Sequence, residues 1–346
     1  MIEIFKERIR QGKPLHIRGA GSKDWYGNAF NGDVLDTRSH AGIVAYEPTE
    51  LFVTAKCGTP LAEIEAALAA SGQCLPFEPP RFSPDSTVGG AVAAGLSGPR
   101  RASAGSLRDY VLGVKIIDGE ARELTFGGQV MKNVAGYDVS RLIAGSLGTL
   151  GLITEVTLKV LPKPVAEATL RFEMNQSEAL DKLNAWGRQP LPIVASAWAE
   201  GVLTLRLAGA RAAVESAKQK LGAGGTAPDS FWSDLRDQRL PFFATETLWR
   251  LSVPSVAPQL ELPGEQLIEW GGALRWLKSD VLPETIRAAA TSVGGSAMLY
   301  RAPAALKTRV GAFAPLSAPL LKLHRNLKAA FDPKGIFNPG RMYKEF

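Results

Sequence analysis

The chain is poor in the residues that most often bind metals. Its 346 residues include two cysteines, Cys57 and Cys74, which are too few and too far apart for an iron–sulfur cluster or a cysteine-bound zinc ion. Both are expected to be small buried hydrophobic residues. The three histidines, His16, His40 and His324, show no spacing typical of a pair of ligands. No metal site is therefore predicted.

Long apolar runs are also missing. No stretch approaches the ~18 uninterrupted apolar residues of a transmembrane helix. The first ten residues mix acids and bases and lack the apolar core of a secretory signal. Together with the scarcity of cysteine, this predicts a reducing, cytoplasmic setting. The hydrophobic content of 45% is sufficient for buried cores, and the length predicts two domains.

Charge of one sign does not dominate. The net charge is +6, from 40 Lys and Arg against 34 Asp and Glu. This mild excess favours an anionic substrate or an acidic partner surface. The two locally basic segments, 99–101 and 322–328, have no aromatic residues between their cations, so nucleic-acid binding is not expected.

Two common nucleotide-binding motifs are absent. A Rossmann fingerprint requires G-x-G-x-x-G, but Gly19-Ala20-Gly21 is followed by Asp24 where the third glycine should stand. No G-x-x-x-x-G-K-[ST] sequence occurs, which excludes a P-loop.

What the chain does have is a long run of small residues, Pro84-Asp-Ser-Thr-Val-Gly-Gly-Ala-Val-Ala-Ala-Gly-Leu-Ser-Gly98. Such a run allows backbone N–H groups to approach a ligand closely, and clustered N–H groups suit a pyrophosphate. A tightly packed junction between a turn and a helix would have the same composition. The run alone leaves both interpretations open.

Three further segments accompany it: PLHIRGAGSK (14–23), GSLGTLGLITEV (145–156) and FDPKGIFNPGR (331–341). In this order and spacing, the four segments resemble the FAD-linked oxidases typified by vanillyl-alcohol oxidase and p-cresol methylhydroxylase (VAO/PCMH type). The resemblance implies that the first loop and the small-residue run hold the FAD pyrophosphate. It also implies that the third segment lies along the flavin and that the closing segment packs back on the flavin domain.

The resemblance further implies FAD bound without a covalent link, since neither 19–23 nor 98–105 contains a histidine or cysteine. Arg18, Ser22 and Lys23 are expected to contribute to the phosphates. The full set of candidate FAD-binding residues is Arg18, Gly19, Ala20, Gly21, Ser22, Lys23, Ser86, Thr87, Gly89, Gly90, Gly95, Gly98, Gly105, Gly148 and Ile153.

The fold class expected is α+β. A VAO/PCMH-type flavin domain of two subdomains is expected over residues 1–165, followed by a short antiparallel α/β cap over 166–316. Residues 317–346 are expected to form a helix and tail that return to the flavin domain. The cap pattern of strands, hairpins and helices predicts an antiparallel sheet with helices on one face. A helix over 60–70 is predicted with Thr59 as its N-cap.

Oxidation of a small 2-hydroxy acid by a flavin requires a cation for the carboxylate and a base for the hydroxyl proton. The candidate cations are Arg250, Arg275, Arg301 and Arg341, although an ordinary solvated role is open for each. A base is harder to find. Relatives that oxidise D-2-hydroxy acids hold a metal with histidines of the cap, and residues 166–316 contain no histidine.

In three features the chain resembles the small FAD-binding subunits of glycolate oxidase (glycolate dehydrogenase). These features are the lack of histidine in the cap, the short cap itself and the segment VMKNVAGYDVSRLIAGSLGTLG (130–151). The resemblance implies two partners, a larger flavoprotein subunit that oxidises glycolate and an iron–sulfur subunit. Electrons would pass to a quinone-type acceptor, and membrane contact would be indirect, through the partners.

Three possibilities stay open. The first is such a subunit. The second is a self-sufficient flavin dehydrogenase of another small 2-hydroxy acid, with Tyr300 or Tyr137 at the substrate, and the third is a non-catalytic assembly subunit. Turnover by the isolated chain distinguishes the second possibility. Loss of flavin with intact folding distinguishes the third.

Overall fold

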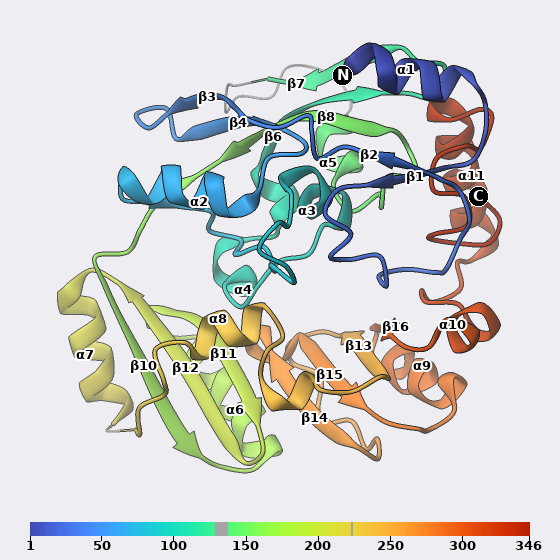
Figure 1. Cartoon of the computed structure of the whole chain (residues 1–346). Helices are drawn as coiled ribbons and strands as arrows, with labels where there is room; N and C mark the ends of the chain where they lie inside the picture. The colour runs from blue at the N-terminus through green and yellow to red at the C-terminus, as the bar shows by residue number, and fades with distance from the viewer. Residues whose placement is uncertain (129–137, 223) are drawn as a thin grey trace. The chain divides into compact units, whose positions relative to one another are not determined.

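The chain divides into two compact units (Figure 1). Unit 1 contains Met1–Ser97, Ser106–Pro162 and Pro315–Phe346, and unit 2 contains Gly98–Gly105 and Lys163–Ala314. This computed structural model describes residues 1–128, 138–222 and 224–346. Within those ranges, no helix has both the length and the apolar character needed to cross a bilayer.

Unit 1 is built on a five-stranded antiparallel sheet in the order β3-β4-β8-β6-β7. Helices α2, α3 and α5 supply apolar side chains to its main core, and α3 is rich in glycine and alanine, which lets it lie close to β4 and β8. The strands are β3 (Ile43–Glu47), β4 (Phe52–Lys56), β6 (Val111–Ile117), β7 (Glu123–Gly127) and β8 (Leu152–Lys159), and the helices are α2 (Leu61–Ala70), α3 (Val88–Ala94) and α5 (Val139–Ile143).

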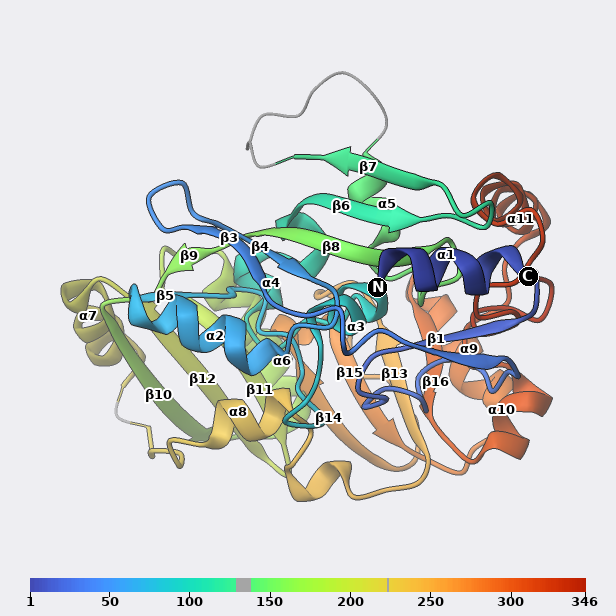
Figure 2. The same ribbon diagram turned by 45° about the horizontal axis from the view of Figure 1, so that its top comes forward.

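A parallel pair, β1 (Leu15–Arg18) and β2 (Asp33–Asp36), forms the second part of unit 1. Helix α1 (Ile2–Arg10) lies over this pair (Figure 2) and buries Phe5 and Ile9 against it, as its amphipathic sequence predicts. The last helix, α11 (Ala318–Phe331), and the residues after it also belong to unit 1.

Unit 2 is a seven-stranded antiparallel sheet in the order β10-β12-β11-β14-β15-β13-β16. The strand register places the core contacts of α6, α7 and α9 on one face of the sheet, as predicted. The prediction was wrong for the short helix α8 (Phe231–Arg236), which lies on the other face, where Nε1 of Trp232 donates to Oγ1 of Thr169 on β10. The strands are β10 (Ala166–Glu173), β11 (Ile193–Ala199), β12 (Val202–Gly209), β13 (Leu248–Ser252), β14 (Glu265–Glu269), β15 (Leu274–Lys278) and β16 (Ser296–Arg301), and the helices are α6 (Gln176–Gly187), α7 (Arg211–Leu221) and α9 (Pro283–Ser292).

Two local predictions have different outcomes. The hairpin across Glu200 and Gly201 is confirmed, and both residues have positive φ (51° and 77°), as a tight primed turn requires. The N-cap of α2 was wrong, because Pro60 occupies that position and Thr59 makes no cap hydrogen bond. The Thr59 hydroxyl instead donates to the carbonyl of Lys56 at 2.7 Å, which closes the turn before the helix.

Candidate functional site

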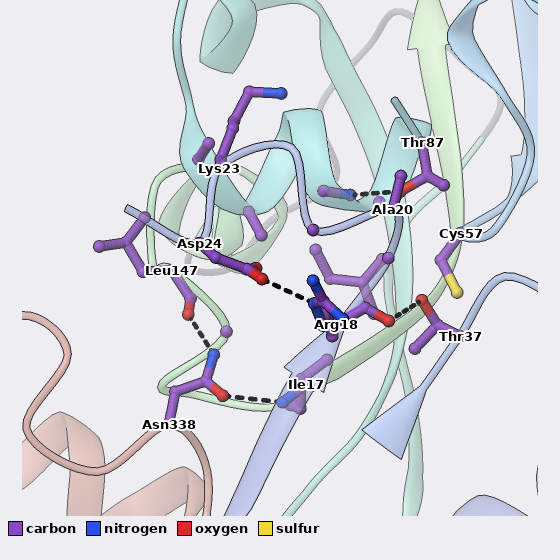
Figure 3. Close-up of a pocket in the computed structure, with 18 of the residues that line it drawn as sticks. Ile17, Arg18, Ala20, Lys23, Asp24, Thr37, Cys57, Thr87, Leu147 and Asn338 are labelled. Carbon is purple, nitrogen blue, oxygen red and sulfur yellow. Dashed lines mark hydrogen bonds and ion pairs between the residues drawn. The ribbon is translucent and has the colours of Figure 1, made fainter. Parts of the chain in front are cut away.

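A pocket opens in unit 1 where β1 ends (Figure 3). Its empty space is about 720 Å³, part of which is open to solvent. Its walls come from distant parts of the sequence: the loop 17–26, Thr37 and Cys57, residues 87–94 with α3, residues 147–153, and the tail residues Asn338 and Arg341.

The loop after β1 presents backbone donors. Gly21 has a φ of 72°, a conformation that residues with side chains rarely adopt. A Cβ on Gly19 would collide with the hydroxyl of Thr87, so the loop lies directly against the start of α3. The backbone N–H groups of residues 19–22 donate to no acceptor in the part of the protein that the structure describes. Unpaired N–H groups gathered in one loop suit an anion.

The charged side chains that line the pocket are Arg18, Lys23, Asp24 and Arg341, three cations and one carboxylate. Nε of Arg18 donates to Oδ2 of Asp24 at 2.7 Å (Figure 3). Lys23 is buried, with its Nζ 5.4 Å from the ring centre of Phe82. The excess of positive charge favours an anionic ligand.

Arg341, one of the arginines considered for substrate, holds the loop in place. Its side chain is buried, and it donates from Nη2 to the carbonyl of Lys23 (3.0 Å) and from Nε to the carbonyl of Tyr26 (3.3 Å). Burial lowers the pKa of its guanidinium, which stays charged because an arginine begins so high. Arg341 therefore orders the pocket wall by binding carbonyl groups.

Asn338 joins two walls of the pocket. It is 1% exposed and has a φ of 42°. Its Oδ1 accepts from the N–H of Ile17 at 2.9 Å, and its Nδ2 donates to the carbonyl of Leu147 at 2.6 Å (Figure 3). Its own N–H donates to the carbonyl of Leu15 at 3.0 Å. One tail residue thus fixes β1 to the turn that precedes β8.

A buried ion pair anchors the tail that carries Asn338. Nζ of Lys328 donates to Oδ2 of Asp332 (2.7 Å) and to the carbonyls of Thr149 and Phe337 (both 2.8 Å). The same carboxylate accepts from the N–H groups of Ile336 and Phe337. Burial lowers the pKa of Lys328, and Asp332 opposes that shift. Because every oxygen and the ammonium have partners, the pair fixes the path of the chain into the pocket.

Cys57 lines the pocket against α3. A Cβ on Gly89 would lie 2.6 Å from Cβ of Cys57, so glycine is required for this close packing. Burial raises the pKa of the Cys57 thiol to about 12. A thiol that stays protonated is a poor nucleophile, which does not favour a covalent link to a flavin.

Most of the candidate FAD-binding residues lie together. Those that line the pocket are Arg18, Gly19, Ala20, Gly21, Ser22, Lys23, Thr87, Gly89, Gly90, Gly148 and Ile153. Ser86 and Gly95 lie behind it: Ser86 Oγ is 3.1 Å from Ser22 Oγ, and Gly95 packs on the backbone of Gly145. Gly98 and Gly105 belong to unit 2 and do not line this pocket, because the chain enters unit 2 at Gly98 and leaves after Gly105.

The other candidate arginines lie in unit 2. Arg275 is 1% exposed and donates to the carbonyls of Ala257, Pro258 and Gly272, a structural role that does not fit substrate binding. Arg301 donates to the carbonyl of Phe243 and to Oε1 of Gln238.

Arg250 is different. Its guanidinium lies over the rings of Trp270 (5.3 Å) and Trp276 (5.9 Å), and its side chain makes no hydrogen bond or ion pair with any described residue. Tyr300 is buried, with its hydroxyl 3.3 Å from Nε2 of Gln238. Tyr137 lies outside the described residues.

Sequence reasoning missed several pocket residues, among them Thr37, Cys57, Asp24 and Asn338. Thr37 and Cys57 follow short strands with no local motif, so no sequence signal marks them. Asp24 stands directly after the Gly-rich loop, and Asn338 stands in the FNPG segment. Both could have been proposed from their places in those motifs.

The pocket fits FAD by the chemistry of its donors. The unpaired N–H groups of residues 19–22 and the cations beside them suit a diphosphate. A Cβ on Gly19 would collide with Thr87 at the start of α3, so the loop and α3 lie close together, and a Cβ on Gly89 would collide with Cys57, so α3 also lies close to the residue that follows β4. The apolar residues Leu147, Leu152 and Ile153 offer contact for ring systems.

Comparison with known proteins agrees with this geometry. Residues 1–141 match the family model described as an FAD binding domain, and residues 315–342 match the C-terminal domain of FAD linked oxidases. A solved structure of alkyldihydroxyacetonephosphate synthase superposes with a TM-score of 0.67, covering 98% of this chain and 74% of that one. At 16% identity, this likeness shows a shared fold.

Two curated relatives are glycolate oxidase subunits. Over 159 residues, 45% of this chain and 34% of the relative, the chain is 33% identical to glycolate oxidase subunit GlcD of Bacillus subtilis (strain 168). It is 50% identical over 346 residues, 100% of the chain and 97% of the relative, to glycolate oxidase subunit GlcE of Escherichia coli (strain K12). The chain therefore belongs to the family of glycolate oxidase subunit GlcE, among the FAD-linked oxidases of VAO/PCMH type.

Proposed function

We propose that this chain is the FAD-binding subunit of a glycolate dehydrogenase (glycolate oxidase) that converts glycolate to glyoxylate. The observation that carries the proposal is the 50% identity to GlcE over the full length, in a chain whose pocket has the donors that FAD needs. The chain has an FAD-binding domain, and the cofactor is FAD.

In this proposal FAD is bound without a covalent link. The N–H groups of loop 19–22, with Arg18 and Lys23, hold the diphosphate, and Thr87, Gly89 and Gly90 form the opposite wall. Gly148 and Ile153 contact the rings. When bound, FAD supplies a two-electron acceptor for the oxidation of a 2-hydroxy acid. Asn338 and Arg341 hold the walls of the pocket together through their hydrogen bonds to Ile17, Leu147 and Lys23.

The proposed partners are a larger flavoprotein subunit that oxidises glycolate and an iron–sulfur subunit that passes electrons to a quinone-type acceptor. Similarity to GlcD, whose name also marks it as a glycolate oxidase subunit, supports an assembly of more than one flavoprotein chain. We propose a cytoplasmic location, with any membrane contact made through the partners.

A second candidate function is favoured by Arg250. Of the four arginines considered for a carboxylate, it alone has a side chain that makes no hydrogen bond or ion pair with the described residues. An arginine that lies on two indole rings with its donors unused suits a small carboxylate. This supports a self-sufficient dehydrogenase of a small 2-hydroxy acid.

The visible spectrum of the purified chain, recorded before and after anaerobic addition of glycolate, tests the proposal. Flavin bands that persist with glycolate support a flavoprotein subunit whose substrate is oxidised by its partner. Bands that bleach make this chain itself catalytic, as the second candidate requires. A folded chain with no flavin bands, even after incubation with FAD, would leave a non-catalytic assembly subunit. Acid precipitation should release the flavin into the supernatant if it is not covalently bound.

A further inference from the structure

The carboxylate of Asp24 lies between the guanidinium of Arg18 and the imidazole of His16. Oδ2 of Asp24 accepts from Nε of Arg18 at 2.7 Å, and Oδ1 lies 3.8 Å from Nε2 of His16. That histidine nitrogen is buried and has no hydrogen-bond partner in the described structure. Asp24 is therefore paired with Arg18, and a small movement would bring it into hydrogen-bond distance of His16, whose Nε2 has no hydrogen-bond partner in the described structure.

The guanidinium of Arg18 lies on the loop whose backbone N–H groups suit an anion. Its guanidinium lies against Gly21, because a Cβ built there would be 2.7 Å from both Nε and Cζ. The same loop carries the unpaired N–H groups of residues 19–22. Asp24 thus accepts a hydrogen bond from a cation that lies directly on the anion-binding loop.

We propose that Asp24 is a positioning residue that holds Arg18 over the loop until the diphosphate of FAD displaces it, after which Asp24 pairs with His16, which gains a proton. The inference rests on the proposed function only in taking FAD as the ligand of this pocket. It makes FAD binding a competition between two anions for Arg18. It also couples FAD binding to uptake of a proton at Nε2 of His16.

The charges around His16 set the direction of this coupling. The charged groups that act on it are Asp24 on the loop, Arg18 on its own strand and Arg341 on the tail, and the ring of Phe30 packs edge-on at 4.7 Å. Burial, Arg341 and Arg18 lower the pKa of His16, and Asp24 opposes them. Once Arg18 turns to the diphosphate, the freed carboxylate and the nearby phosphates both favour the protonated imidazole. FAD should therefore bind more tightly as the pH falls from 8 to 6.

Titration calorimetry of the full-length apoprotein with FAD tests this, at pH 6 and 8 and in two buffers of different ionisation enthalpy. For the wild type we expect Kd to be about three- to tenfold lower at pH 6, since one unit of pKa shift is tenfold in affinity, with net proton uptake. Asp24→Asn should lower Kd at pH 8 by about three- to tenfold and abolish proton uptake. His16→Asn should remove the pH dependence with little change at pH 8.

Glu50→Gln is the matched control, because it removes one exposed negative charge from the same unit, at a residue with no described partner. It should leave both Kd and proton uptake unchanged. Circular dichroism confirms that each variant is folded. Wild-type binding that ignores pH, or weaker binding by Asp24→Asn, would overturn this inference while leaving the FAD assignment intact. Failure of the folded wild type to bind FAD or ADP at either pH would overturn both.

Discussion

The substitution Asn338→Ala removes the side chain that joins two pocket walls. It leaves the N–H of Ile17 and the carbonyl of Leu147 without their partners in a buried place. Each orphaned group costs about 1–3 kcal/mol, and an alanine at a φ of 42° adds about 1 kcal/mol of backbone strain. The expected loss is about 3–7 kcal/mol, a large part of the ~5–15 kcal/mol stability of a typical domain.

Thermal unfolding measures this loss. For a unit of this size, about 3–7 kcal/mol corresponds to a fall in Tm of roughly 6–28 °C. Asn338→Gly should recover about 1 kcal/mol of it, since glycine accepts the positive φ without strain. Asn338→Asp keeps the acceptor for Ile17 but places a carboxylate beside the carbonyl of Leu147, and should be intermediate or worse. The exposed Asn326 on α11 provides the control Asn326→Ala, which should leave Tm within 2 °C, about the scale of surface substitutions.

The affinity for FAD distinguishes a pocket clamp from a purely structural contact. At a temperature where both apoproteins are folded, Asn338→Gly should bind FAD several-fold more weakly than wild type. The reason is that no side chain then joins Ile17 of one pocket wall to Leu147 of the other. A melting temperature within 2 °C of wild type for Asn338→Ala would refute the energetic reasoning. Wild-type affinity in a destabilised Asn338→Gly would show that the bridge supports the fold and not the pocket.

Three other predictions follow from single contacts. Gly89→Ala should lower Tm and weaken FAD binding, because its Cβ would lie 2.6 Å from Cβ of Cys57 and 2.9 Å from the carbonyl oxygen of Cys57. Gly90→Ala meets only the hydroxyl of Thr87, at 3.1 Å, and should leave Tm nearly unchanged. With a pKa near 12, Cys57 should resist alkylation by iodoacetamide at pH 8 in the folded protein and react only after unfolding, as mass spectrometry would show. Burial lowers the pKa of His40 in the folded state, so its contribution to stability is complete above about pH 6.5 and is lost as the pH falls toward that lowered pKa. In urea unfolding from pH 8 to 5, the free energy of unfolding should therefore fall less in His40→Asn than in wild type.

Sequence patterns found the parts of the pocket that are local. The glycines of 19–21, 89–90 and 148 stand in short segments that are rich in small residues, which indicates that the backbone there approaches a neighbouring group closely. The alternation and turn signals likewise gave the hairpins of unit 2, including the one at Glu200. Each of these features depends on neighbours within a few residues, which a single sequence displays.

What could not be predicted depends on partners far along the chain. The hydrogen bond from Ile17 to Asn338 spans 321 positions, and the one from Asn338 to Leu147 spans 191. The excursion of residues 98–105 into unit 2 is of the same kind: Trp270 donates from Nε1 to the carbonyl of Gly98 at 3.0 Å, and Ser103 donates to the carbonyl of Val194. No periodicity or motif encodes such pairings. The glycines at 98 and 105 therefore looked like part of the flavin loop.

The candidate arginines show how burial and partners separate side chains that a sequence presents as equal. Arg275 and Arg341 are buried and spend their donors on backbone carbonyls, so replacing either with lysine should destabilise the fold, since one ammonium cannot reach acceptors arranged for a planar fork. Arg250 has no such acceptors among the described residues, and its attraction to two indole rings survives in part with lysine. Arg250→Lys should therefore melt within about 2 °C of wild type, as a substitution that breaks no hydrogen bond does, whereas Arg275→Lys should lose several times more. If Arg250→Lys unfolds as early as Arg275→Lys, Arg250 is part of the framework of unit 2, and the case for carboxylate binding at that residue fails.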